Sequence, residues 1–467
     1  MSKKFWLRGI ALLLSSLILC PLLTGCGEQT IKETNEFSVY NLINSKIPMK
    51  SSGFYEYVIS EYASRYPDVS LDYRTSDLDY VALIWGDGIT DEIGDALQEY
   101  YDSISIDIMK GNCKDIIYAD TFYQWFYDVT PPDYNKMICA GAFIDLKPLL
   151  SEIAPELDLS VYDSLLIDGK LYAIPFYRQP YTIASAEKML DKWGFNFDAN
   201  DDILTFLRKC AAWQEEHSYD NDAPVVFTKQ AWDYIYYNIF NIIGTDVMDY
   251  ENRTANFDAP KVREVIELLY QLKSDFEEPT GNAVDHGNET LIYDKALFGH
   301  PDGTYSTLMM AAHGYNYLND PALIMPLRQM DGNVATGSYT YFMIPENAKN
   351  KYNAARYIAL VQESVISIQK HERKVSGNRY AWNYLYSFDI KPDEFENLIS
   401  NHIQLNYASD HVADTVRNMY HNQGDICMPS YWYHNLKHLF DDYMNGEMSI
   451  DELMTDVQDR LKIYVSE

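Results

Sequence analysis

Two histidines four residues apart are the first residues in the sequence whose types and spacing could support chemistry. His434 and His438 would share one face of a helix, which is the spacing of paired zinc ligands in metalloproteases. In those enzymes a glutamate that acts as general base follows the first histidine, whereas here the next residue is Asn435. The pair does not predict a zinc hydrolase, and we expect no metal and no cofactor.

A second candidate for metal chemistry is the segment that contains Asp198, Asn200 and Asp202, which begins like a calcium-binding loop. Such a loop needs a glycine at its central turn and a glutamate at its end, and the sequence has Ile203 and Lys209 at those places. These side chains are better suited to capping the helix that follows them.

The sequence contains no glycine-rich phosphate loop, no nucleophile elbow and no dinucleotide-binding fingerprint. Its 69 carboxylates are so numerous that a pair at the spacing of a glycosidase would carry little information. We therefore expect a protein that is not an enzyme, and we keep an extracellular glycoside hydrolase as an alternative.

Aromatic side chains are abundant, with 40 Tyr, 19 Phe and 8 Trp. Tyr and Trp combine an apolar ring face with a hydrogen-bonding tip, which suits stacking on a sugar or gripping a peptide. In the stretch DGKLYAIPFYRQPY, a strand-like run ends at Tyr177, Arg178 and Tyr181. These three side chains either line a cleft or mark the edge of a sheet.

The N-terminus has the pattern of a targeting segment. Basic residues precede an apolar run at 10–23, which ends in LTGC, the lipobox of bacterial lipoproteins. This pattern predicts that residues 1–25 are removed, that Cys26 carries the lipid anchor, and that residues 26–36 form a polar tether. A plain secretion signal is the alternative. No later stretch reaches the roughly 20 apolar residues that a membrane-spanning helix needs.

The formal net charge of −32 predicts a surface that repels nucleic acid and anionic lipid. We therefore expect contact with the membrane through the lipid, and no nucleic-acid partner. Cys113, Cys139, Cys210 and Cys427 are widely and irregularly spaced, which fits no zinc pattern and leaves disulfides and free thiols equally open.

Strand and helix patterns alternate along the first part of the mature chain. Strands are predicted at 37–40, 69–74 and 116–120, and helices at 54–65 and around 104–109. This alternation predicts a mainly parallel α/β sheet, in which ligands lie beyond the carboxyl ends of the strands. Asp120 is the last residue of the third strand.

Two later helices carry clear start signals. A helix that begins near Asp258 and Pro260 has an apolar face that extends to Phe276, and another opens with a capping box of Ser449 and Glu452. Both must pack against other elements. Trp232 lies at helical spacing with Ile235 and Ile239, so a core position and a stacking platform for a ligand are both open.

Taken with these elements, the segment DGKLYAIPF followed by EKMLDKWGF resembles family-one extracellular solute-binding proteins, the receptors of ABC importers related to maltose-binding protein. Other segments that resemble the family follow in its order: SEYASRYPDVSLDY, IDIMKGNCKDIIYAD, AFIDLKPLL, DILTFLRKCAAW, NFDAPKVREVIELLYQL, SYTYFMIPENAKNKYNAARYIALV and EMSIDELMTDVQDRL. The resemblance extends over nearly the whole mature chain. Cys113 and Lys114 depart from it, since the family often has Gly and Pro there.

The resemblance implies an α/β fold of two lobes, with a ligand cleft between them and a hinge of several strands. It implies a first lobe at about 37–178 plus 300–343 and a second at about 179–299 plus 344–467.

It also implies a monomeric lipoprotein on the outer face of the bacterial cytoplasmic membrane. That protein would capture a sugar or oligosaccharide and deliver it to ABC permease subunits. A surface glycan-binding sensor is a further alternative. The ligand-binding residues expected near the crossings are Asp120, Tyr177, Arg178, Tyr181, Trp232 and Tyr339.

Overall fold

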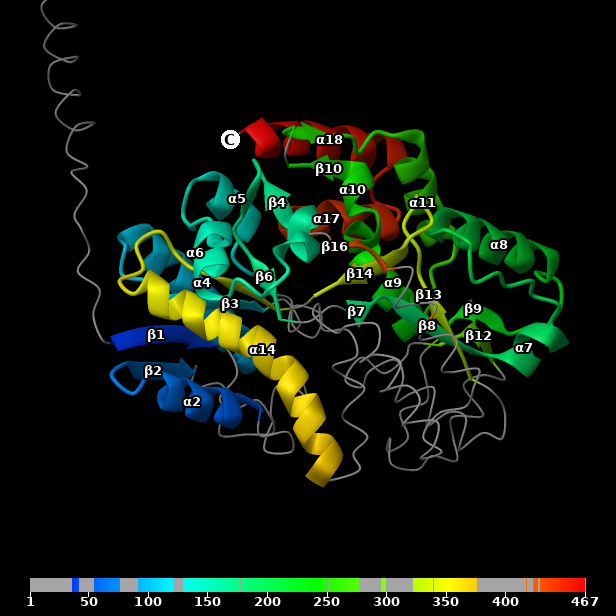
Figure 1. Ribbon diagram of the computed structural model, residues 1–467. Coiled ribbons are helices and arrows are strands. Elements are labelled where there is room, and N and C mark those ends of the chain that lie inside the picture. Colours follow the sequence, from blue (N-terminus) through cyan, green and yellow to red (C-terminus); the bar gives the residue numbers. More distant parts are fainter. Residues whose placement is uncertain are drawn as a thin grey trace, which may run out of the picture.

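A computed structural model gives the structure of the protein and describes residues 36–41, 54–75, 91–120, 129–176, 179–250, 252–276, 295–299, 322–338, 340–375, 417, 423–426 and 429–466. The buried apolar side chains in these residues form two separate cores. Figure 1 shows the corresponding two lobes, with the first on the left and the second on the right. Within the described residues, no helix is long and apolar enough to cross a bilayer.

The first lobe is built on a five-stranded sheet in the order β2-β1-β3-β15-β6. Its strands are β1 (Glu36–Asn41), β2 (Ser70–Thr75), β3 (Ile116–Asp120), β6 (Ile174–Pro175) and β15 (Thr340–Met343). β1 is parallel to β2 and β3, whereas β15 is antiparallel to β3 and β6. The strands predicted near 37–40, 69–74 and 116–120 are confirmed and run parallel to one another. The sheet as a whole is mixed rather than mainly parallel, because β15 is antiparallel to both of its neighbours.

Helices cover this sheet. They are α2 (Phe54–Arg65), α4 (Asp91–Lys110), α5 (Tyr134–Cys139), α6 (Leu146–Ile153), the 3₁₀-helix η3 (Leu159–Leu165) and α14 (Lys351–Val375). α2 has the predicted bounds. α4 begins well before the stretch around 104–109 because its buried apolar stripe already starts at Leu97 and continues through Tyr101 to Ile108.

A short hairpin precedes the hinge. β4 (Leu166–Ile167) and β5 (Lys170–Leu171) pair antiparallel across Asp168 and Gly169, whose φ angles are 51° and 71°. Two central residues with positive φ are typical of a type I′ turn, for which Asp-Gly is a preferred sequence.

The second lobe combines short strand pairs with helices. Its strands are β8 (Thr182–Ala186), β9 (Val225–Phe227), β10 (Met248–Asp249), β11 (Thr254–Ala255), β12 (Ala296–Phe298) and β13 (Ala322–Pro326). Its helices are α7 (Glu187–Lys192), α8 (Ile203–Glu216), α9 (Lys229–Ile242), α10 (Gly244–Val247), α11 (Pro260–Gln271), α17 (Tyr431–Met444) and α18 (Ile450–Ser466). β13 is antiparallel to β8, and β12 is parallel to β9.

Between the lobes lies a three-stranded sheet in the order β16-β14-β7, which we call the hinge sheet (Figure 1). It consists of β7 (Gln179–Pro180), β14 (Val334–Gly337) and β16 (Gln423–Ile426). The strand β7 lies between Phe176, which belongs to the first core, and Tyr181, which belongs to the second. The chain therefore crosses between the lobes at this sheet.

The cores correct the lobe boundaries expected from the sequence. The segment 300–343 was expected in the first lobe, but Met325, Leu327 and Ala335 belong to the core of the second. The segment 344–467 was expected in the second lobe, but residues 344–361 belong to the core of the first. The pairing of β13 with β8 keeps residues 322–326 in the second lobe, and β15 (Thr340–Met343) is the next strand that belongs to the sheet of the first.

Asp115 fixes α14 in the first lobe. Its side chain is 4% exposed, and one carboxylate oxygen accepts hydrogen bonds from the backbone N–H groups of Lys349 and Asn350, just before the helix. The other oxygen accepts from the backbone N–H and the hydroxyl of Ser38 in β1. One buried carboxylate thus ties the start of the helix to β1, an inner strand of the sheet.

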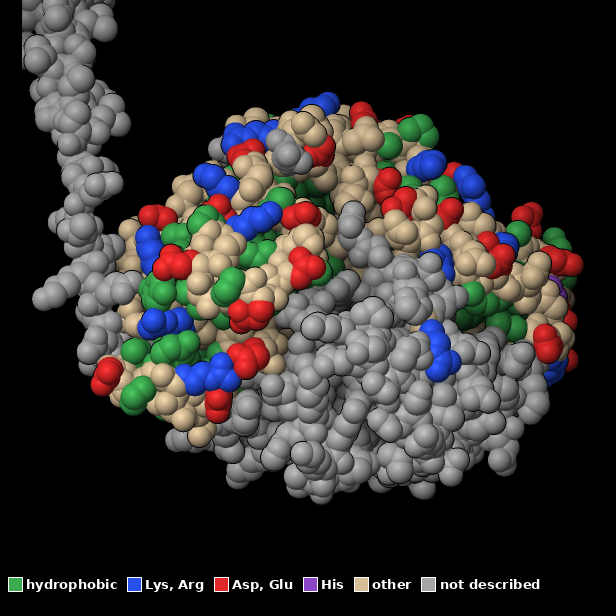
Figure 2. Space-filling model, viewed as in Figure 1, with side chains coloured by type: hydrophobic (Ala, Val, Ile, Leu, Met, Phe, Trp, Pro, Cys, Tyr) green, Lys and Arg blue, Asp and Glu red, His purple; other side chains and the backbone are tan. Residues whose placement is uncertain are grey.

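Charged side chains are mixed over the described surface. On the face in Figure 2, Lys and Arg are interspersed with Asp and Glu over both lobes. Several form exposed pairs, such as Arg208 with Glu264 and Arg263 with Asp451. Because exposed pairs contribute little to stability, the fold depends mainly on its two cores.

Candidate functional site

The hinge is the candidate functional site, because the strand pairing brings the predicted segments together there. Asp120 pairs with Thr340, and Pro175 pairs with Tyr341. On the hinge sheet, Gln179 pairs with Gly337. Three segments far apart in the sequence therefore meet where the chain passes between lobes.

Four of the predicted site residues, Cys26, Tyr177, Arg178 and Tyr339, lie outside the described residues. For Asp120 the structure describes the backbone, at the carboxyl end of β3, and not the side chain. The roles of these five residues stay predictions. The structure shows that the strands next to Asp120, Tyr177, Arg178 and Tyr339 in the sequence meet at the hinge.

Tyr181 is built into the hinge. It is 4% exposed, its backbone N–H donates to the carbonyl of Ala335 at 2.9 Å, and its carbonyl accepts from the N–H of Leu327 at 2.8 Å. Its ring lies so close to Gly337 that a Cβ added there would meet the ring carbon Cζ at 2.8 Å. Only glycine leaves room for the tyrosine at this contact, so the ring position and the strand position depend on each other.

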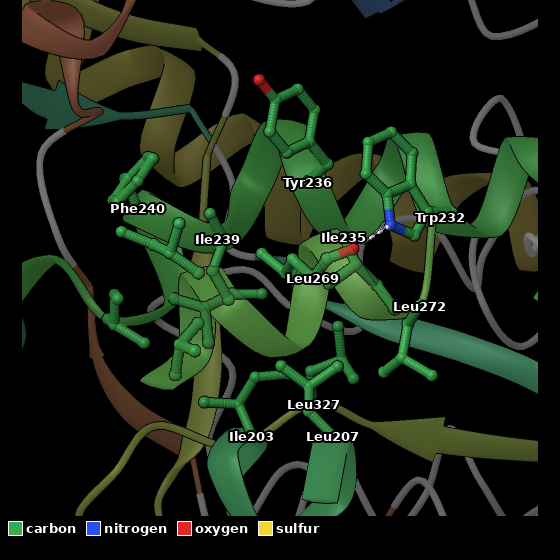
Figure 3. Packing of buried hydrophobic residues seen from close by; sticks show 14 of the residues in the cluster. Ile203, Leu207, Trp232, Ile235, Tyr236, Ile239, Phe240, Leu269, Leu272 and Leu327 are labelled. Carbon is green, nitrogen blue, oxygen red and sulfur yellow. Dashed lines mark hydrogen bonds between the residues drawn. The ribbon is translucent and has the colours of Figure 1, made fainter. Parts of the chain in front are cut away.

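Trp232 lies apart from the hinge contacts, inside the core of the second lobe (Figure 3). Its side chain is 5% exposed and stacks on Tyr236 with 4.8 Å between ring centroids. Its indole N–H donates to the carbonyl of Leu269 at 3.0 Å. These contacts favour the structural interpretation of this residue over that of a stacking platform.

Buried polar side chains at the hinge bond to backbone groups. The Ser338 hydroxyl donates to the carbonyl of Thr340, and the Ser430 hydroxyl donates to the carbonyl of Phe240. The side-chain oxygen of Asn241 accepts from the backbone N–H of Ser430. These bonds satisfy backbone groups where strands and helices end, so they maintain the crossing geometry.

Contacts outside the hinge sheet also join the lobes. Asp133, at the start of α5, accepts a hydrogen bond from the Tyr464 hydroxyl of α18. Burial raises the pKa of Asp133 above its ordinary value, although the bond from Tyr464 opposes that shift. Sequence reasoning missed these residues because no local pattern signals a contact between positions hundreds of residues apart.

The structure describes both segments that were considered for metal chemistry. Burial lowers the pKa of His434 to about 4, so its imidazole is neutral near pH 7. Asp202 caps α8 by accepting from the N–H of Thr205. Over the part of the chain that the structure describes, no three His, Cys, Asp or Glu side chains are grouped to hold a metal ion.

Three of the cysteines lie in the described part of the chain. Cys113, Cys139 and Cys210 are free thiols there, and Cys210 is fully buried. Burial raises the pKa of all three thiols, so they are poor nucleophiles. Cys427 lies outside the described residues.

A surface cavity of about 210 Å³ lies elsewhere, at the outer edge of the second lobe. It is bounded by the end of α8, the strand β9 and the residues after α11, including Trp213, His217 and Lys273. Figure 1 places α8 and β9 far from the hinge sheet. The cavity is therefore separate from the candidate site.

Comparisons by sequence identify no relatives: no protein-family model matches the chain, and no curated protein matches it. Comparison of structures identifies similar proteins. An ABC substrate-binding protein from Listeria monocytogenes in complex with cycloalternan has a TM-score of 0.52 at 10% identity, over 92% of this chain and 99% of that one. A cyclic alpha-maltosyl-1,6-maltose binding protein from Arthrobacter globiformis has a TM-score of 0.54 at 13% identity, over 92% and 98%.

A third similar structure has a different kind of ligand. It is UgpB from Mycobacterium tuberculosis in complex with glycerophosphocholine, with a TM-score of 0.50 at 13% identity, over 92% of this chain and 98% of that one. The chain therefore has the two-lobed α/β fold of these proteins, as predicted. The range of ligands indicates that the fold alone does not specify what is bound.

Proposed function

We propose that the protein is the substrate-binding lipoprotein of an ABC transporter. In this proposal it captures a sugar or oligosaccharide outside the cell and delivers it, as a monomer, to a membrane permease. The observation that carries the proposal is the pair of lobes with separate cores, joined through the hinge sheet. Such an arrangement suits capture by closure of the lobes around a ligand, without covalent chemistry.

The choice of a carbohydrate has two supports. Of the three similar structures, one is in complex with cycloalternan and another is a cyclic alpha-maltosyl-1,6-maltose binding protein. The chain also has 40 Tyr and 8 Trp, whose rings suit stacking on the apolar faces of sugars. Arg178, Tyr177 and Tyr339 are the proposed ligand contacts beside the hinge, with Asp120 and Tyr181.

The test is calorimetric titration of the protein from residue 27 onward with a panel of linear and cyclic α-glucans and with glycerophosphocholine. We expect a glucan to bind and to reduce the radius of gyration in small-angle scattering. Arg178→Ala should weaken that binding roughly tenfold or more, because a guanidinium can donate two hydrogen bonds to sugar hydroxyls. Arg208→Ala, which removes an exposed pair in the second lobe, is the matched control and should leave the affinity unchanged.

Two results would count against the proposal. Binding of glycerophosphocholine alone would exclude the carbohydrate, and turnover of a glycan would favour the hydrolase. Equal affinity of Arg178→Ala and the parent protein would remove Arg178 from the site.

We also propose that the protein is anchored at the outer face of the bacterial cytoplasmic membrane through Cys26. Replacing Cys26 with alanine should abolish incorporation of labelled fatty acid and release the protein from the membrane fraction, because the lipid is attached to this thiol. The control is Cys113→Ala, which leaves the lipobox intact and should remain labelled. Continued labelling of Cys26→Ala would show that the LTGC pattern is not a lipobox.

A further inference from the structure

The first lobe is joined to the second by polar contacts that lie outside the hinge sheet. Asp133 caps α5 by accepting from the N–H of Lys136 at 3.0 Å. The same carboxylate accepts from the Tyr464 hydroxyl at 2.7 Å and from the Asn435 amide at 3.2 Å. Figure 1 shows the end of α18 reaching over α5. One helix cap in the first lobe is therefore tied to two helices of the second.

Asn135, two residues further along α5, makes a second connection. It is fully buried, and its amide nitrogen donates to the Tyr250 hydroxyl at 2.8 Å and to the carbonyl of Pro429 at 3.1 Å. Within the part of the chain that the structure describes, its side-chain oxygen has no hydrogen-bond partner, and neither has the buried Tyr431 hydroxyl. A buried unpaired group costs about 1–3 kcal/mol, so this junction is not the most stable arrangement of its own side chains.

Asp168 and Arg253 make the third connection, between two turns. The guanidinium of Arg253 in the second lobe lies 3.5 Å from the carboxylate of Asp168 in the first. Among the described residues, these are the only two non-glycine residues with positive φ, at 51° and 52°. Each lies in a local turn, Asp168 between β4 and β5 and Arg253 between β10 and β11.

We propose that these three connections form a latch that holds the two lobes at the angle seen here, and that the latch must release when the lobes rotate. The contacts lie off the hinge sheet, so rotation about the hinge has to separate them. The bonds to the Asp133 carboxylate favour the latched angle, whereas the unpaired side-chain oxygen of Asn135 disfavours it. This balance allows release at modest cost. Coupling of release to ligand uptake rests on the function proposed above, but the latch itself does not.

The latch is tested without ligand, by pulsed electron paramagnetic resonance between labels on the two lobes. Met109 in α4 and Tyr219 after α8 are 76% and 96% exposed, and labelled unnatural amino acids at these positions avoid the native cysteines. Tyr464→Phe removes the hydroxyl that donates to Asp133, and Asn435→Ala removes the amide. Each variant should lower the population at the latched distance, relative to the populations at other distances, by roughly five- to tenfold. This factor corresponds to the contribution of one net hydrogen bond.

The control is Tyr270→Phe, the same chemical change in α11, where the ring is 44% exposed and packs on Tyr443 of its own lobe. Its distance distribution should match that of the parent protein. If Tyr464→Phe does not fold, Asp168→Asn replaces it, since asparagine tolerates the left-handed turn and removes the charge that faces Arg253. Distributions that coincide in all folded variants would overturn the latch, whatever the protein binds.

Discussion

Replacing Trp232 with alanine is expected to lower the free energy of unfolding of the second lobe by about 3–5 kcal/mol. The indole is 5% exposed, stacks on Tyr236 and donates to the Leu269 carbonyl. As Figure 3 shows, it lies against the C-terminal part of α11, where Leu269 and Leu272 belong to the same core. Alanine would leave a cavity and an unpaired buried carbonyl. Urea denaturation followed by circular dichroism measures the loss.

Two further variants separate packing from ligand binding. Trp232→Phe keeps most of the ring volume and loses the indole N–H, so it should cost less than alanine. Tyr219→Ala changes a side chain that is 96% exposed and should cost less than about 0.5 kcal/mol. If Trp232→Ala lost glycan affinity while its free energy of unfolding stayed unchanged, Trp232 would be a stacking platform for the ligand and not a core residue.

Replacing Asp115 with alanine should be comparably damaging to the first lobe, because each buried donor left without a partner costs about 1–3 kcal/mol. The carboxylate accepts from the N–H groups of Ser38, Lys349 and Asn350, and all of these donors would lose their partner. Because two of them lie at the start of α14, the helix should loosen from the sheet. Faster hydrogen exchange of amides in residues 351–361 would report this directly, together with a lower midpoint in urea.

The matched comparison is Asp115→Asn, which keeps one acceptor oxygen. Its free energy of unfolding should fall by less than that of Asp115→Ala. Asp459→Ala, which removes an exposed partner of Lys462 on α18, should leave the exchange of α14 unchanged. If Asp115→Ala unfolds at the same urea concentration as the parent protein, the carboxylate does not hold the helix.

Elements with local signals could be predicted from the sequence. α2 has the predicted bounds because Pro67 disfavours helix just before it, and α18 opens with the predicted reciprocal bonds of Ser449 and Glu452. Pro260 lies in the first turn of α11 as predicted. Asp258 does not cap that helix: the cap position is Ala259, and no side chain bonds there. The position of a cap depends on a single residue, whereas sequence patterns locate the end of a helix only to within one or two residues.

The lobe boundaries could not be predicted because they depend on contacts that no local pattern encodes. The segment 322–326 has the same strand-like composition whether it pairs with β8 or joins the first sheet, and only its register with residues 182–186 decides between them. The site was predictable in part. The sequence located the crossing at 175–181, where β7 lies, and Tyr181 beside it. It did not reveal Gly337, whose role depends on a ring that packs against it from the other crossing.

The interleaving of the two cores has a consequence for how the chain folds. The second lobe draws its core from residues between 181 and 272, from 297–298, from 325–335 and from 432–461. The first draws its core from residues between 39 and 176, from 341–361 and from Ile426 and Tyr431. Neither core is complete until residues beyond 426 have been synthesised. Native contacts over such long sequence separations form slowly. In the export proposed above, both lobes would therefore stay incomplete until nearly the whole chain is available.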